Sequence, residues 1–282
     1  MILETLNSLA KIYADRELDR KFIQNEGCML QNEAFSFQVA FKLEENSDPA
    51  KAAFGFSVDI PEELKPYTRI KAIDYVPCDY TLYPPCLGLS DHPEQGLFPD
   101  ILRDIPTIYW ASTNSWRGVY ITIDAQNACL KPGIYTIKTI FKYKGEYTKE
   151  FRIEVLDAKL PPQSIPVTNW FHTDCLCNYY HVEFDSKEYW RITENFAKTA
   201  VHYGINMLLM PVFTPPLDTG VGYERRTIQL VDVFKDADKY SFGFRKLRKW
   251  VKMCKRVGVK YYEISHLFTQ WGCKYSPKVM AT

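Results

Sequence analysis

Two sequence patterns predict a mixed fold class, all-β in the first part of the chain and α/β in the second. Between about residues 28 and 157, apolar and polar residues alternate with a period of two in several segments, as in strands with one buried face. After three prolines within residues 158–166, short apolar runs alternate with amphipathic segments of helical period. We therefore expect an N-terminal β-sandwich in residues 1–157, followed in residues 158–282 by the first βα units of an incomplete (β/α)₈ barrel.

The composition is that of an ordinary globular protein, and it narrows the function classes. The 282 residues are 46% hydrophobic and 24% charged, and 35 Lys and Arg balance 34 Asp and Glu. This balance argues against nucleic acid and membrane surfaces as partners, and no apolar run is long enough to cross a bilayer. The first residues lack the pattern of a signal peptide, so we expect a cytoplasmic protein whose eight cysteines are reduced.

Local patterns predict the elements of the first part. Residues 1–22 predict a short leading helix, because Ile2, Leu6, Leu9 and Tyr13 share one face at helical spacing. Strands are expected in 34–43, 52–60 and 116–125, and two more in 130–158 joined by a tight turn at Lys144–Gly145. In the first of these strands Phe35, Phe37, Val39 and Phe41 should face the core, and Ser36, Gln38, Ala40 and Lys42 should face water.

Residues 78–115 differ from the segments around them. They are rich in proline and aromatic residues, and we expect a long ordered loop between sheets.

The second part predicts a β-α-β-α-β order. Strands are expected in 167–172, 205–212 and 259–268, and helices in 186–204 and 242–258. The second strand is almost wholly apolar, which is typical of a parallel sheet covered on both faces. Gly204 and Gly258 should end the two helices. The expected inward stripes are Ile192, Phe196 and Ala200 in the first helix, and Phe244, Leu247, Val251 and Cys254 in the second.

Repeated βα units build either an open nucleotide-binding sheet or a closed barrel. No glycine-rich phosphate turn follows any of the three strands, which argues against the open sheet. A barrel needs about five more strands, so we expect its remainder to lie beyond residue 282. Assembly with a second chain through the open barrel edge and a smaller sheet domain are the alternatives.

Three motifs in the second part carry a family resemblance. They are WFHTDCL at 170–176, PVFTPPLDT at 211–219 and EISHLFTQWG at 263–272. Together with the preceding sandwich they resemble glycoside hydrolase family 123. The resemblance implies a β-sandwich followed by a TIM-like barrel, and exo-hydrolysis of β-linked N-acetylgalactosamine. It also implies a substrate-assisted mechanism, in which the sugar's 2-acetamido oxygen attacks the anomeric carbon.

The catalytic residues that the resemblance implies are an adjacent Asp-Glu pair. The Asp orients the acetamido group and the Glu protonates the leaving oxygen, at the end of a later barrel strand. No Asp is followed directly by Glu in these 282 residues. We therefore assign no catalytic residue, and we expect this chain to be inactive alone.

Chemistry in such barrels lies at the C-terminal ends of the strands, so three places are expected to bind the sugar. They contribute His172 and Asp174 after the first strand, Thr214 and Asp218 after the second, and Glu263, His266, Gln270 and Trp271 at or after the third. Carboxylates and imidazoles can bind hydroxyl groups, and Trp271 can present a flat ring. Arg225 and Arg226 offer further polar groups in the loop after the second strand, which is expected to act as a lid or subsite wall. The structural alternatives are loop anchoring, a solvated loop with both arginines in water, and a packed Trp beside a Glu paired with a barrel Arg.

Two other functions stay open. A non-catalytic carbohydrate-binding protein would use the same residues without the carboxylate pair. A metal-dependent barrel hydrolase would use His172, Asp174 and His266, extended by Cys175 and Cys177, although these do not match a known zinc spacing. The leading expectation has a glycan or amino-sugar substrate as partner, no cofactor and no metal.

Overall fold

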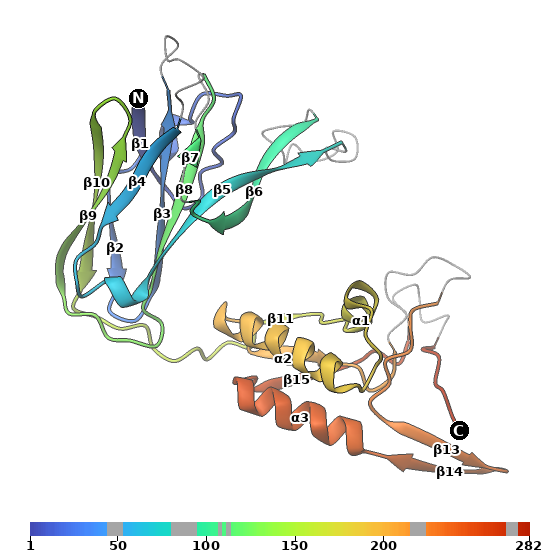
Figure 1. Cartoon of the computed structure of the whole chain (residues 1–282). Helices are drawn as coiled ribbons and strands as arrows, with labels where there is room; N and C mark the ends of the chain where they lie inside the picture. The colour runs from blue at the N-terminus through green and yellow to red at the C-terminus, as the bar shows by residue number, and fades with distance from the viewer. Residues whose placement is uncertain (44–52, 80–94, 107–108, 111–113, 215–223, 269–275) are drawn as a thin grey trace. The chain divides into compact units, whose positions relative to one another are not determined.

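The computed structural model describes residues 1–43, 53–79, 95–106, 109–110, 114–214, 224–268 and 276–282. The chain divides into two compact units, Met1–Pro161 and Pro162–Thr282 (Figure 1). The predicted mixture of sheets and helices is confirmed, with sheets predominating. None of the helices among the described residues has the length and apolar character needed to cross a membrane.

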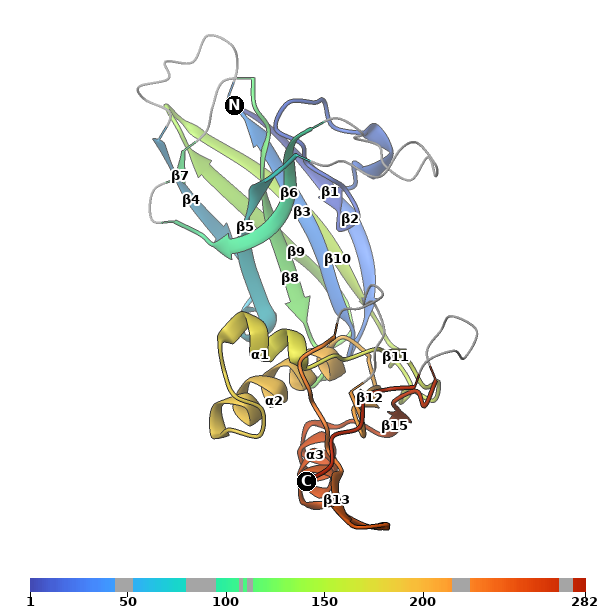
Figure 2. The ribbon, with the colours of Figure 1, turned by 90° about the vertical axis from the view of Figure 1, so that its right-hand side faces the viewer.

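The first unit consists of two five-stranded sheets around one core. The first sheet contains, in spatial order, β1 (Ile2–Asn7), β3 (Ala34–Lys42), β8 (Arg117–Asp124), β5 (Thr68–Cys78) and β6 (Gly96–Asp104). The second contains β2 (Glu26–Leu30), β10 (Glu146–Leu156), β9 (Gly133–Lys142), β4 (Ala53–Asp59) and β7 (Tyr109–Trp110). Figure 2 shows the long strands β3, β8, β9 and β10 running alongside one another. The described residues of the unit also form short 3-10 turns at Arg20–Phe22 and Lys65–Tyr67.

Aromatic stacking joins the two sheets. The ring of Phe37 on β3 stacks on the ring of Phe151 on β10, with the centroids 4.0 Å apart and the planes at 14°. Both side chains are almost fully buried, at 1% exposure each. The sheets therefore share one core, and their inward residues are those that the period of two predicted.

The predicted leading helix is wrong. Residues 2–7 form β1, which pairs antiparallel with β3 from Ile2 opposite Lys42 to Asn7 opposite Phe37. An isolated helix of this length is marginal in water, and the backbone gains a complete ladder by pairing with β3 instead. Leu9, expected on the inward face, is 75% exposed.

The outward face of β3 is also buried, contrary to the alternation in its sequence. Gln38 and Ala40 are covered by the chain that follows β1, where Ile12 is fully buried. The Nε2 amide of Gln38 donates to the carbonyl oxygens of Asn7 at 3.0 Å and Ala10 at 2.8 Å. Gln38 can therefore be buried because its amide is hydrogen-bonded to this covering segment.

The expected loop at 78–115 contains strands. β6 pairs antiparallel with β5 and forms the edge of its sheet, and β7 pairs with β4. Pro99 lies within β6, and an edge strand tolerates a residue that cannot donate to the ladder. The pairing shifts register between Asp74 and Tyr75 on β5, opposite this part of β6. Proline was therefore a poor indicator of a loop at this position.

The second unit contains the predicted parallel sheet. β11 (Thr168–Asn169), β12 (Met207–Met210) and β15 (Tyr261–Ile264) are parallel and lie in sequence order. The helices are α1 (Asp174–Tyr180), α2 (Lys187–His202) and α3 (Arg245–Val257), and a hairpin of β13 (Asp232–Asp236) and β14 (Lys239–Gly243) precedes α3. Neither α1 nor the hairpin was predicted.

Helices α2 and α3 lie side by side against the sheet (Figure 1). Their inward residues include Tyr189 and Trp250, which are fully buried and share a core with Leu208 and Met210 of β12. The predicted helix ends are confirmed. Gly258, with a φ angle of 99°, is the C-cap of α3, and Gly204, with a φ angle of 89°, follows Tyr203, the C-cap of α2.

Two residues of the predicted inward stripes lie elsewhere. Phe196 of α2 is 41% exposed, because the buried face of that helix runs through Tyr189, Thr193 and Ala197. Phe244 is 43% exposed, because it is the N-cap of α3 and precedes the first turn.

The contact between the two sheets gives a stability prediction. Phe151→Ala should lower the free energy of unfolding by about 3–5 kcal/mol, because it removes a buried ring and leaves a cavity under Phe37. Ile134→Ala on β9 is the control, since Ile134 is 58% exposed and should cost no more than about 0.5 kcal/mol. Calorimetry of the whole chain measures both, and equal effects would contradict the stacked core.

Candidate functional site

A carboxylate links the first and third strands of the parallel sheet. The indole Nε1–H of Trp170, directly after β11, donates to Oε1 of Glu263 on β15 at 3.1 Å. The hydroxyl of Thr168 on β11 donates to Oε2 of the same carboxylate at 3.2 Å. Both oxygens of Glu263 are therefore used to join two strands that are separated by β12.

The register of the sheet produces this arrangement. Thr168 lies opposite Met207 on β12, and Leu209 of the same strand lies opposite Glu263. Because side chains alternate along a strand, Thr168, Leu209 and Glu263 share one face of the sheet. Leu208 belongs to the other face, where it packs in the core with the helices. The Glu263 contacts therefore lie on the face that α2 and α3 do not cover.

Two imidazoles flank Trp170 at the same end of the sheet. The ring centroid of His266 lies 5.1 Å from that of Trp170, and the centroid of His172 lies 6.4 Å away, both edge to face. The Nδ1 atom of His266 is buried and has no protein hydrogen-bond partner among the described residues. Both ring nitrogens of His172 are also buried. We call Trp170, His172, Glu263 and His266 the rim cluster.

Asp174 forms a paired contact with Arg225. The Arg225 Nε donates to Oδ2 of Asp174 at 2.8 Å, and Nη2 donates to Oδ1 at 2.9 Å. The two side chains are only 11% and 9% exposed, so this is a buried two-point ion pair. It ties the chain at 224–226 to the first turn of α1, and Nη2 also lies 3.5 Å from the sulfur of Cys175.

This ion pair bears on the metal alternative. A cation bound to Asp174 would compete with Arg225 for both carboxylate oxygens and would be repelled by the guanidinium. The residues that the structure describes contain no group of three or more His, Cys, Asp or Glu side chains placed to hold a metal. The geometry therefore offers Asp174 as an anchor for Arg225.

Thr214 is buried, and its hydroxyl is hydrogen-bonded to the backbone of Ile228. Its hydroxyl donates to the carbonyl oxygen of Ile228 at 3.2 Å and accepts from the Ile228 amide at 2.8 Å. These bonds hold together the two ends of the chain around 215–223. Asp218, Gln270 and Trp271 lie outside the described residues.

The structure thus brings together three of the residues expected at the strand ends, His172, Glu263 and His266, and adds Trp170. Trp170 is part of the first sequence motif, but the sequence alone did not single it out. Its place two residues after Thr168, at the end of β11, puts it on the same face of the sheet as Glu263. The partner of Asp174 could not be predicted, because Arg225 is 51 residues away in the sequence.

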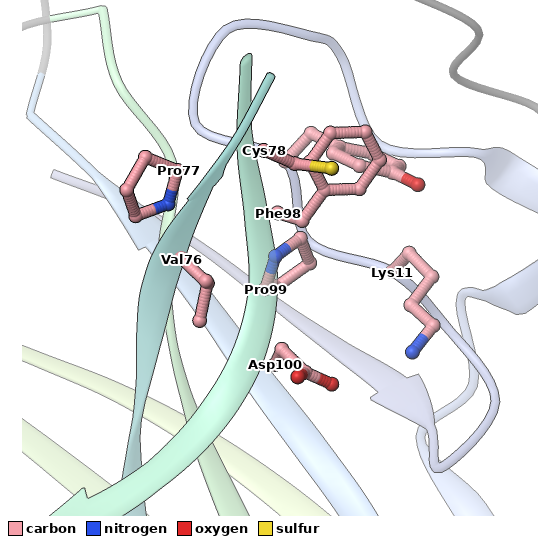
Figure 3. A pocket seen from close by; sticks show the side chains of 8 residues that line it. Lys11, Val76, Pro77, Cys78, Phe98, Pro99 and Asp100 are labelled. Carbon is pink, nitrogen blue, oxygen red and sulfur yellow. The ribbon is translucent and has the colours of Figure 1, made fainter. Parts of the chain in front are cut away.

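A separate pocket lies in the first unit, with a volume of about 300 Å³ (Figure 3). Figure 3 shows Phe98, Pro99 and Asp100 of β6 facing Lys11 of the N-terminal segment. Its lining is mainly apolar and consists of Lys11, Tyr13, Val76, Pro77, Cys78, Phe98, Pro99 and Asp100. It contains none of the residues that the sequence motifs indicated.

Comparison with known proteins shows what the second unit is similar to. Residues 170–282 match the model of the glycoside hydrolase 123 catalytic domain. A solved family 123 glycoside hydrolase from Clostridium perfringens, described in terms of glycolipid glycan hydrolysis, superposes with a TM-score of 0.68 and 15% identity. The match covers 92% of this chain and 46% of that one, so this chain spans about half the length of the relative.

Other solved structures are more distant. The C-terminal domain of an antigen I/II-family protein from Streptococcus pyogenes has a TM-score of 0.29 and 12% identity, over 56% of this chain and 53% of that one. A family 5 xyloglucanase from Bacteroides ovatus has a TM-score of 0.25 and 9% identity, over 88% of this chain and 45% of that one. Scores this low carry no argument, and no curated protein matches the sequence.

The family model begins at Trp170, the first residue of the rim cluster, and runs to the last residue of the chain. At 15% identity the superposition shows a shared fold. Residues 170–282 are thus similar to the glycoside hydrolase family 123 catalytic domain, and the chain is similar in fold to a family 123 enzyme.

Proposed function

We propose that the second unit is the opening part of a (β/α)₈ barrel whose rim binds an N-acetylhexosamine residue of a β-linked glycan. One observation carries the proposal: Glu263, Trp170 and two imidazoles gather at the C-terminal ends of parallel strands in sequence order. Barrel enzymes bind substrate at this end of their strands. The family match at residues 170–282 supports a glycan as the ligand.

The partly exposed face of the sheet supports the barrel. On the face opposite the helices Trp170 and Tyr261 are 47% and 42% exposed, although Leu209 of the middle strand is buried there. In a closed barrel this face turns inward and is covered by the other strands. We place the division between the β-sandwich domain and the barrel domain at residues 157 and 158.

The proposed roles at the rim follow from hydrogen-bonding capacity. Glu263 already accepts from Thr168 and Trp170, and each carboxylate oxygen has a further lone pair for a sugar hydroxyl. We therefore assign Glu263 to binding rather than proton donation. His266 has a ring nitrogen without a protein partner among the described residues, which suits a hydroxyl or the acetamido group.

The other residues expected from the sequence have two kinds of proposed role, support of the rim and contact with the sugar from the loops. We propose that Asp174 and Thr214 hold the rim in place, through Arg225 and through the backbone at Ile228. His172 packs beside Trp170 and is proposed to support the ring. Asp218, Gln270 and Trp271 are proposed to contact the sugar from the loops after the second and third strands.

The proposed reaction is substrate-assisted hydrolysis of β-linked N-acetylgalactosamine glycans. The 2-acetamido oxygen forms a bond to the anomeric carbon as the glycosidic C–O bond breaks and its leaving oxygen takes a proton. Water then attacks the anomeric carbon, breaks its bond to the acetamido oxygen and gives the sugar with retention. The residues described here bind and orient the sugar, and the acid and the orienting carboxylate come from another part of the barrel.

A second candidate is a non-catalytic carbohydrate-binding protein. It is favoured by the lack of any adjacent Asp-Glu pair in the 282 residues. Both candidates bind the sugar, and these 282 residues supply no adjacent Asp-Glu pair in either case. Release of 4-nitrophenol from an aryl N-acetyl-β-galactosaminide by the protein expressed from the whole open reading frame supports the first candidate. Binding without release by that protein supports the second candidate.

Sugar binding is the direct test of the site. Methyl N-acetyl-β-galactosaminide should show saturation transfer from the whole chain, and methyl β-galactoside should bind more weakly. Glu263→Gln should weaken binding by about tenfold, since a charged acceptor is lost. Glu150→Gln, at an exposed position of β10, is the control and should leave affinity unchanged. The proposal would be contradicted if the wild-type chain showed no saturation transfer to the amino sugar, or if it bound both sugars with equal affinity.

The anchoring role of Asp174 has its own test. Asp174→Asn and Arg225→Met should each cost about 3–5 kcal/mol of stability, because each leaves a buried charge without its partner. The double variant should lose less than the sum of the two single losses. Urea unfolding of the whole chain gives the three values, and strict additivity would show that the two residues do not act as a pair.

A further inference from the structure

Trp170 combines solvent exposure with a fixed orientation. Its side chain is 47% exposed, yet its Nε1–H is hydrogen-bonded to Glu263 at 3.1 Å. The edge-to-face contact with His266, at 5.1 Å and 75°, restricts the ring from a second side. The two other described tryptophans of this unit, Trp190 and Trp250, are buried at 6% and 0% exposure. Among the described residues of the unit, Trp170 is thus the tryptophan that presents its ring to solvent.

The position of Trp170 depends on Glu263. The Glu263 carboxylate accepts hydrogen bonds from Thr168 of β11 and from Trp170, which follows β11. It therefore cannot rotate without losing one of the two bonds. Glu263 itself is placed by its pairing opposite Leu209, a fully buried residue of the middle strand. The indole is therefore held relative to all three strands and not only to its own.

A pyranose ring requires this combination of groups. One face of such a ring is made of C–H groups and packs on an aromatic ring, while its hydroxyls need donors and acceptors around the edge of that ring. An indole with one polar corner suits this purpose, since its body is apolar and its N–H is engaged. Glu263 and His266 supply an acceptor and an imidazole nitrogen directly beside the indole.

We propose that Trp170 is the stacking platform for the N-acetylhexosamine ring, and that Glu263 is the residue that positions it. This inference rests on the proposed function, because it assumes that the rim binds an amino sugar. It assigns the stacking role to the residue directly after β11. A tryptophan that served only the fold would gain more by burying its ring, as Trp190 and Trp250 do.

The experiment follows indole N–H signals in ¹⁵N-labelled whole chain during titration with methyl N-acetyl-β-galactosaminide. The chain has six tryptophans, and Trp170→Phe identifies the Trp170 signal by its loss. We expect this signal to shift saturably in the wild type. Trp170→Ala should weaken binding by about tenfold or more, because the apolar contact surface is lost, whereas Trp170→Phe retains a ring and should lose less.

A positioning role for Glu263 has a separate readout. Glu263→Gln should move the Trp170 indole signal before any sugar is added, since the charged acceptor of that N–H is removed. In the Trp170→Phe background, which lacks the N–H, Glu263→Gln should weaken sugar binding less than it does in the wild type. Equal losses in the two backgrounds would overturn the positioning role.

Phe234→Ala is the matched control, because Phe234 is an aromatic residue of similar exposure, 46%, on the β13–β14 hairpin of the same unit. It should leave the dissociation constant unchanged. An unchanged dissociation constant for Trp170→Ala, or an equal loss in Phe234→Ala, overturns the platform and leaves the proposed function standing. A wild-type chain that does not bind the sugar at all overturns the proposed function itself.

Discussion

The carboxylate of Glu263 is the contact on which the arrangement of the rim depends. It joins Thr168 and Trp170 to the third strand across the middle one, through hydrogen bonds of 3.2 and 3.1 Å. The contact exists only in one register, because a slip of one residue in either outer strand would turn its side chain toward the helices. Every proposed role at the rim follows from that register.

The core beneath the sheet fixes the register. Trp250 and Tyr189 from the two helices are fully buried against the inward residues of β12. Burial raises the pKa of the Cys254 thiol to about 12, so this cysteine of α3 stays neutral and behaves as an apolar core residue. Burial also raises the pKa of the Tyr189 hydroxyl, which hydrogen-bonds with Thr173 at 2.9 Å. The segment after β11 is thereby tied to α2.

Periodicity predicted the parts of the fold in which one face is buried and one is wet. The three parallel strands, the two long helices and their glycine ends follow directly from the sequence. Prediction failed where strand pairing overrode a local pattern. Leu6 and Leu9 have helical spacing in the sequence, but Leu6 lies in β1 and Leu9 lies in the segment after it. It failed again at Pro99, which an edge strand accepts. The hairpin after β12 has no such period, because its exposed positions mix the aromatic residues Phe234, Tyr240 and Phe242 with polar ones.

The sequence predicted where in the fold the site lies, but it did not predict most of the contacts between its residues. The rule that barrel chemistry lies at strand ends selected Glu263 and His266, which the structure brings beside Trp170. The same rule selected Asp174 and Thr214, whose polar atoms are bound to Arg225 and the Ile228 backbone. A sequence does not show which polar groups already have partners, since those partners are 51 and 14 residues away.

The central claim, that Glu263 and Trp170 are coupled across the sheet, is tested most directly by a double-mutant cycle on stability. The single variants are Trp170→Phe and Glu263→Gln, and unfolding of the whole chain is measured for these, the double variant and the wild type. We predict a coupling free energy of about 0.5–1.5 kcal/mol, the usual range for one such hydrogen bond. A coupling of zero would mean that the two side chains do not meet, and the rim as described here would be wrong.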